Sequence, residues 1–151
     1  MATIPKPIIG HTAKIAVIDL DISGVPAKVD TGADSSAIWA SSVVEKADGL
    51  YCVFFGPGSP FYSGKTVKVD NGYRRIKVAN SFGEKELRYR LKLRIRVKGK
   101  LVRATFTLSD RSMKAYPVLL GRRLLQGKFL VDVSRGDRQK PAAQTKPGRQ
   151  Y

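Results

Sequence analysis

Apolar and basic residues alternate without a break over residues 87–97, Leu-Arg-Tyr-Arg-Leu-Lys-Leu-Arg-Ile-Arg-Val. Only a β-strand with one buried face satisfies this period of two, because successive side chains of a strand point to opposite sides. Lys98-Gly99 follows as a two-residue turn. With Val97 opposite Lys100, the expected register sets Ile95 opposite Val102, Leu93 opposite Ala104, Leu91 opposite Phe106 and Tyr89 opposite Leu108. The sequence therefore predicts a long β-hairpin with a continuous apolar face.

The other face of this hairpin is basic. It carries Arg88, Arg90, Lys92, Arg94, Arg96 and, from the return strand, Arg103. Like charges side by side on a strand repel one another, and a partner of opposite charge would relieve that repulsion. An anion-binding face is one interpretation, and a solvated surface in a generally basic protein is the other.

Charge points to the same class of partner. Lys and Arg number 28 against 12 Asp and Glu, which gives a net charge of +16. A charge of this size favours polyanionic partners, but it does not distinguish phosphate from carboxylate. Nucleic acid, a ribosome surface and an acidic polypeptide all remain open.

A second feature is an acid presented at the end of a strand. The apolar approach Val25, Ala27 and Val29 leads into Asp30-Thr31-Gly32. Glycine permits a sharp reversal and a close approach of backbone, and a threonine hydroxyl can fix a loop by hydrogen bonding. The Asp30 carboxylate is thereby presented by the backbone.

Two segments together resemble a known fold. Val29-Asp-Thr-Gly-Ala-Asp34 resembles the active-site loop of retropepsin-type aspartic proteases, and Tyr116-Pro-Val-Leu-Leu-Gly-Arg-Arg-Leu-Leu125 resembles the hydrophobic-hydrophobic-Gly element that supports this loop. More closely, residues from about 11 to 134 resemble a bacterial family, RimB-like, that carries the label ATP-dependent zinc protease. The run from Leu108 to Met113 and on to Asp132 is specific to that family. The resemblance implies an all-β, single-domain acid-protease barrel with little helix.

The resemblance also implies a role for each site residue. Asp30, Thr31 and Gly32 would be the catalytic loop, with support from Ala33, Asp34, Gly121 and Arg122. An Asp34–Arg122 ion pair is expected to brace the loop. Because the chain has a single Asp-Thr-Gly, the two carboxylates that share a proton in such enzymes would both be Asp30, one from each subunit of a homodimer.

The sequence contains no recognisable motif for binding the zinc or the ATP that the family label names. The chain has one His and one Cys, with neither a His-Glu-x-x-His motif nor a Gly-x-x-x-x-Gly-Lys-Ser/Thr motif. We therefore predict no metal site and no cofactor. His11 is expected to be a surface or packing residue, and Cys52 a small core residue.

One domain is expected from 151 residues of which 42% are hydrophobic. We predict an N-terminal arm over residues 1–10, the retropepsin-like domain over 11–134 and a disordered basic tail over 135–151. No apolar run of 18 residues and no signal-peptide pattern are found, so we expect a cytoplasmic location and no membrane partner.

The segments between the two motifs are less regular. We expect strands over 14–20 and 51–55, a turn over 21–24, a loop over 56–60 and a short helical or irregular turn over 35–43. A hairpin is predicted over 66–78, with its turn at 70–72. Either this hairpin or the segment 79–83 would be the flap that closes over substrate in retropepsins. Trp39 is interpreted as a core residue, with a substrate-facing role as the alternative.

Two functions remain open at this stage. The first is a homodimeric aspartic endopeptidase. The resemblance adds acidic or glutamate-rich substrates, because relatives are often associated with an ATP-grasp enzyme that adds glutamates to a ribosomal protein. The second is a non-catalytic module that binds RNA or acidic protein tails through its basic sheet face.

Overall fold

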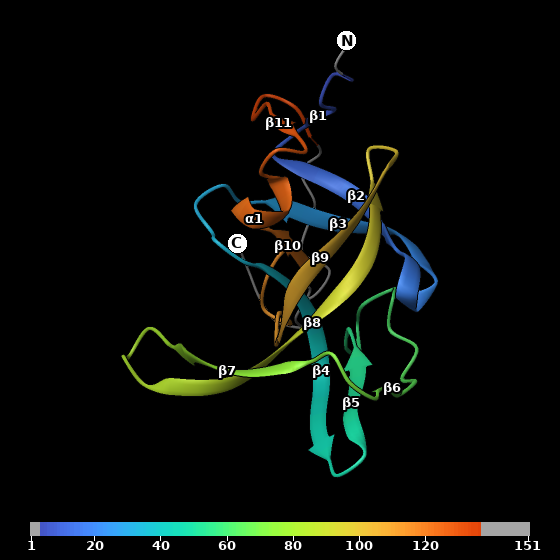
Figure 1. Cartoon of the computed structure of the whole chain (residues 1–151), viewed down its shortest axis with the longest axis vertical. Coiled ribbons are helices and arrows are strands. Elements are labelled where there is room, and N and C mark those ends of the chain that lie inside the picture. The colour runs from blue at the N-terminus through green and yellow to red at the C-terminus, as the bar shows by residue number, and fades with distance from the viewer. Residues whose placement is uncertain (1–3, 137–151) are drawn as a thin grey trace, which may run out of the picture.

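Six strands close on themselves into a barrel (Figure 1). The computed structural model describes residues 4–136 of the chain. The barrel strands are β2 (Thr12–Val17), β3 (Ile22–Val29), β4 (Ser36–Lys46), β8 (Lys85–Val97), β9 (Lys100–Ser109) and β10 (Val118–Leu120). Their order is β10-β3-β2-β8-β9-β4, and β10 also pairs β4, which closes the ring. The predicted all-β, single-domain barrel is confirmed.

The predicted hairpin is β8–β9. Its register matches the prediction at every pair, from Val97 opposite Lys100 to Tyr89 opposite Leu108. Leu91, Leu93, Ile95 and Val97 of the alternation are buried in the core, whereas Leu87 is 52% exposed where β8 extends beyond the barrel (Figure 1). The hairpin thus supplies a large part of the barrel wall.

Shorter elements surround the barrel. β5 (Gly49–Phe54) and β6 (Val67–Val69) extend the sheet beyond β4, and β7 (Arg74–Ala79) pairs β8. β1 (Ile8–Ile9) and β11 (Leu130–Val131) form a separate two-stranded parallel sheet. Within residues 4–136, the helical elements are the 3₁₀ turn η1 (Ile18–Leu20) and the single-turn α1 (Arg122–Leu125). The predicted N-terminal arm, residues 1–10, therefore contains strand β1. Of the predicted tail, residues 135–151, all but residues 135 and 136 lie outside the described part of the chain.

Two of the predicted elements were wrong. The segment 35–43, expected as a helical or irregular turn, belongs to strand β4, because Ile38 and Trp39 are buried between parallel β9 and antiparallel β10. The predicted hairpin over 66–78 does not form, because β6 pairs β5 and β7 pairs β8. In addition, the first reversal comes earlier than expected, at η1, with Asp21 in the left-handed region.

The β7–β8 hairpin projects from the barrel as an arm (Figure 1). Its turn is stabilised by Asn80, whose Oδ1 accepts hydrogen bonds from the backbone N–H groups of Phe82 (2.9 Å) and Glu84 (3.0 Å). Phe82 at the tip is 88% exposed. Of the two flap candidates, only the segment 79–83 lies at the turn of a hairpin.

Trp39 is a core residue, as predicted. Its side chain is 6% exposed, and a Cβ on Gly56 would lie only 2.5 Å from its ring. Glycine at this point of the loop 56–60 leaves room for the indole. The aromatic ring thus anchors the loop to the barrel.

Cys52 is a second predicted core residue, and it yields a prediction. The side chain is fully buried, and burial raises the pKa of its thiol to about 11. Since the thiolate is the reactive form, Cys52 should not react with Ellman's reagent at pH 8 in the folded protein. In denaturant, one thiol per chain should react at once. Rapid labelling of the native protein would contradict this burial.

Candidate active site

Asp30 lies where β3 leaves the barrel. Its backbone N–H donates to the carbonyl of Leu120 on β10 (2.9 Å), and its own carbonyl accepts from Ala33 (3.2 Å). Its carboxylate Oδ1 accepts from the backbone N–H of Gly32 (3.0 Å). Asp30 is half-buried, whereas Thr31 and Gly32 are exposed. The loop thus holds one carboxylate in a defined position at the surface.

The segment after β10 clamps this loop from the other side. The N–H groups of Arg122 and Arg123 donate to the carbonyls of Ala33 (2.7 Å) and Asp34 (3.2 Å). The N–H of Gly121 donates to the hydroxyl of the buried Ser36 (2.9 Å). A Cβ on Gly121 would lie 2.4 Å from the carbonyl oxygen of Ser35, so only glycine fits. The two motifs found in the sequence are therefore joined by backbone contacts.

The predicted contact between Asp34 and Arg122 is present. Arg122 Nη2 lies 3.3 Å from Asp34 Oδ1, and its Nη1 donates to the carbonyl of Thr31 (3.2 Å). Arg123 adds a contact that the sequence reasoning missed, with Nε 3.1 Å from Asp34 Oδ2. The sequence feature that indicates the Arg123–Asp34 contact is the pair of arginines directly after Gly121. These side chains are largely exposed, so they contribute orientation more than stability.

The candidate catalytic loop presents one carboxylate, that of Asp30. The sequence holds one Asp-Thr-Gly, and one carboxylate cannot act as acid and as base in the same step.

Within residues 4–136 there is no group of three or more His, Cys, Asp and Glu side chains that could hold a metal. His11 is bound instead to the backbone, with Nδ1 against the carbonyl oxygen of Arg135.

The predicted basic face divides into paired and unpaired residues. Arg88 forms an ion pair with Glu86 (2.6 Å), and Arg94 forms one with Asp19 (2.8 Å). Burial works against ionisation of Asp19, yet the hydrogen bonds from Arg94 prevail and lower the pKa of this carboxyl. Neither arginine is therefore free to bind a polyanion without losing a partner.

Three other residues of the predicted face line a pocket of about 450 Å³. They are Arg90, Lys92 and Arg103, whereas Arg96 lies outside the pocket. The sequence reasoning missed the other three cationic residues of the lining, because spacing along the chain does not reveal them. We call the whole the cationic pocket, whose charged members are Arg74, Arg90, Lys92, Arg103, Arg123 and Lys128.

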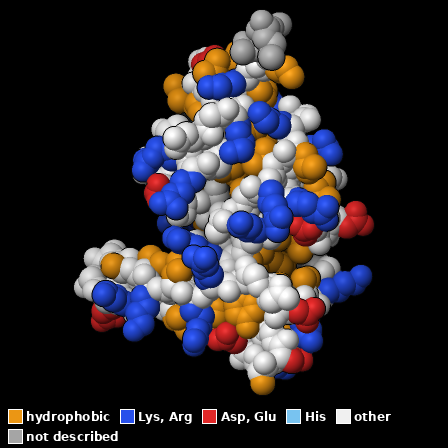
Figure 2. All heavy atoms as spheres, viewed as in Figure 1, with side chains coloured by type: hydrophobic (Ala, Val, Ile, Leu, Met, Phe, Trp, Pro, Cys, Tyr) orange, Lys and Arg blue, Asp and Glu red, His pale blue; other side chains and the backbone are white. Residues whose placement is uncertain are grey.

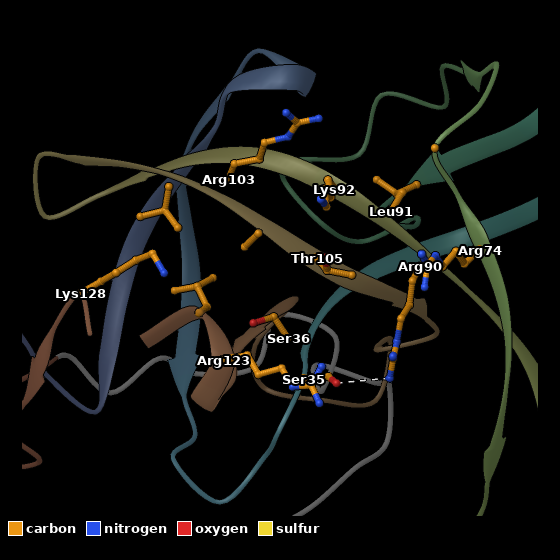
Figure 3. Close-up of a pocket in the computed structure, with 14 residues that line it drawn as sticks. Ser35, Ser36, Arg74, Arg90, Leu91, Lys92, Arg103, Thr105, Arg123 and Lys128 are labelled. Atoms are coloured by element: carbon orange, nitrogen blue, oxygen red, sulfur yellow. Dashed lines mark hydrogen bonds between the residues drawn. The ribbon is translucent and has the colours of Figure 1, made fainter. Parts of the chain in front are cut away.

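The cationic pocket draws on several elements (Figure 3). Lys128, which follows α1, lies at one end, and Arg74 and Arg90 lie at the other. Arg90 Nη2 donates to the hydroxyl of Ser35 in the loop after Asp30 (3.3 Å). Figure 2 shows Lys and Arg side chains gathered over the middle of this face of the molecule. The candidate catalytic loop and the basic sheet face therefore meet at this pocket.

Comparison with known proteins agrees with the fold. The sequence model of a family described as retropepsin-like aspartic endopeptidase RimB matches residues 8–142. A crystal structure of a protein of unknown function from Legionella pneumophila is 27% identical, with a TM-score of 0.63, over 85% of this chain and 95% of that one. Among the described residues, no helix is long and apolar enough to cross a membrane.

Curated relatives carry a different name. Proteins of Shewanella pealeana and Shewanella halifaxensis, each called a probable alpha-L-glutamate ligase, are 29% identical to this chain over 140 residues. The match covers 85% of this chain but only 29% of each relative. Most of the length of each relative therefore lies outside the region that aligns with this chain.

Proposed function

The chain belongs to the RimB-like family of retropepsin-like aspartic endopeptidases, and we propose that it hydrolyses peptide bonds as a homodimer with one Asp30 from each subunit. The observation that carries this proposal is the Asp30 loop, in which the Gly32 N–H donates to the half-buried carboxylate and the Asp30 backbone N–H donates to the Leu120 carbonyl. The family match over residues 8–142 supports a hydrolase.

Two carboxylates a few ångströms apart share one proton, since like charges so close do not both ionise. The ionised Asp30 takes a proton from water as the water oxygen attacks the peptide carbonyl carbon. The protonated Asp30 donates its proton to the carbonyl oxygen. When the C–N bond breaks, the Asp30 that took the water proton gives it to the departing nitrogen, while the other Asp30 takes a hydroxyl proton from the diol, so the pair again shares one proton. No covalent enzyme intermediate is needed.

The neighbouring residues would hold this geometry. Thr31 is proposed to cross-brace the two loops, and Gly32 to line the site. Ala33 and Gly121 support the loop through backbone contacts, and Asp34 and Arg122 support it through their ion pair. The arm formed by β7 and β8 is proposed as the flap, because its tip at 79–83 is a projecting, exposed turn.

An acidic or glutamate-rich peptide is the proposed substrate. The net charge of +16 favours a polyanionic substrate. The partial match to proteins named for glutamate ligation supports glutamate as the acidic residue of that substrate. The ligase name belongs to proteins of which this chain matches 29%, so it does not argue for ligation by this chain. A cytoplasmic location remains a prediction from the sequence.

The cationic pocket favours a second candidate, a non-catalytic module that holds RNA, a ribosome surface or an acidic protein tail. The two candidate functions predict different experimental results. A binding module would leave its partner intact, and binding to nucleic acid would weaken steeply as salt is raised.

The proposal predicts cleavage of a glutamate-rich peptide by the purified chain. Mass spectrometry should detect paired fragments whose masses sum to the peptide plus one water. Because no metal takes part, EDTA and 1,10-phenanthroline should leave the rate unchanged. A neutral peptide of equal length serves as the substrate control. Zinc that copurifies stoichiometrically, with activity lost on its removal, would refute the metal-free mechanism.

A further inference from the structure

We propose that the cationic pocket is an exosite that binds carboxylate side chains of an acidic peptide beside the catalytic loop. This inference rests on the proposed peptidase function, because it names where that enzyme holds its substrate. The site is separate from Asp30 itself, which does not line the pocket.

The charges of the pocket are the first reason. Six cationic side chains and no Asp or Glu line about 450 Å³. Within residues 4–136, Arg123 forms an ion pair with Asp34, and the other five cations have no carboxylate within ion-pair distance. Arg88 and Arg94 on the same strand do have acidic partners outside the pocket. The pocket therefore brings together five cationic side chains that have no acidic partner among the described residues.

The spacing of these charges suits an extended peptide. Arg90 and Lys92 lie two residues apart on one face of β8, which corresponds to roughly 6.6 Å along the strand. Alternate side chains of an extended acidic peptide repeat at the same interval. Two carboxylates of such a peptide would therefore meet Arg90 and Lys92 in turn, with Arg103 and Lys128 within the same pocket.

The position of the pocket connects it to the site of cleavage. Ser35 lines the pocket and lies in the loop that follows Asp30, where its hydroxyl accepts the hydrogen bond from Arg90. Arg123 lines the pocket and also contacts Asp34. A peptide that crosses the Asp30 loop would therefore reach these cations within a few residues.

The composition of the lining favours a peptide over single-stranded nucleic acid. The uncharged members are Ser, Thr, Gly, Ala, Val and Leu, and no aromatic residue is among them. Proteins that bind single strands commonly stack bases on aromatic rings. This pocket offers charge without such a platform.

The test measures binding without turnover, in full-length Asp30→Asn protein. Fluorescence anisotropy would report the affinity of a fluorescein-labelled hexaglutamate peptide. Lys92→Gln with Lys128→Gln, from different parts of the pocket, should weaken binding by about tenfold. The matched control, Lys14→Gln with Lys98→Gln, removes the same charge outside the pocket and should change the affinity less than about twofold. Lys92→Gln alone provides a smaller perturbation, and circular dichroism verifies folding of every variant.

Each result separates the alternatives. Equal weakening by the two double variants would overturn the exosite, because net charge alone would then explain binding. Tighter, pocket-dependent binding of an oligoadenylate RNA would also overturn it, in favour of nucleic acid. Pocket-dependent peptide binding by a chain whose wild type cleaves nothing would support the site and refute the peptidase. Cleavage by wild type with pocket-independent binding would refute the exosite alone.

Discussion

Asp30→Asn should abolish peptidase activity, and an excess of Asp30→Asn subunits should also inactivate wild-type protein. The amide keeps the shape of the side chain but cannot ionise, so the shared proton and the activated water are lost together. In a mixed dimer, one carboxylate would face one amide. Such a dimer has no acid–base pair.

The experiment mixes wild-type and Asp30→Asn chains at increasing ratios and allows subunits to exchange before the rate is measured. Activity should fall with the square of the wild-type fraction, because only dimers of two wild-type chains retain both carboxylates. Wild type diluted with buffer to the same concentrations is the control. A rate proportional to the number of wild-type chains would mean that each chain holds a complete site, and the two-fold pair would be wrong.

The same pair should give a bell-shaped dependence of rate on pH. Both limbs of the profile would report on the pair, since the reaction needs one acid and one base. At low pH both Asp30 groups are protonated and no base remains. At high pH both are ionised and no acid remains.

Gly121→Ala should both destabilise the barrel and displace the candidate catalytic loop. The added Cβ would lie 2.4 Å from the Ser35 carbonyl oxygen and 3.0 Å from that of Ala33. Both contacts are to backbone, in a segment that is held by the Arg122 N–H on the Ala33 carbonyl and by the Gly121 N–H on the Ser36 hydroxyl. Overpacking of this kind costs about 1–3 kcal/mol in the free energy of unfolding, and the Asp30 loop should be displaced as well.

Urea denaturation and the peptidase rate measure the two effects. Gln126→Ala, at the exposed end of α1, is the control and should change stability by less than about 0.5 kcal/mol. We expect Gly121→Ala to lose activity even under conditions where circular dichroism reports a folded barrel. Wild-type stability together with wild-type activity would contradict the tight packing of Gly121 on the loop.

Local pattern in the sequence predicted the parts of the fold that depend on neighbours along the chain. The alternation over 87–97 specified β8 and, through the turn at Lys98-Gly99, the whole register of β9. Strand pairing across a two-residue turn needs no information from elsewhere. Asp30 and Gly121, some ninety residues apart, were associated by resemblance to a family, and their contacts follow that expectation.

Contacts between segments distant in the sequence determined the remaining elements of the fold. The segment 35–43 has no strong alternation, and it became a strand because parallel β9 and antiparallel β10 satisfy its backbone while its apolar side chains enter the core. The residues 70–72 connect β6 to β7 without pairing them, because β6 pairs β5 and β7 pairs β8. Likewise, only the folded chain sets Asp19 against Arg94 and collects Arg74, Arg123 and Lys128 around Arg90 and Lys92. Side chains so far apart in sequence meet through closure of the barrel, which no local spacing encodes.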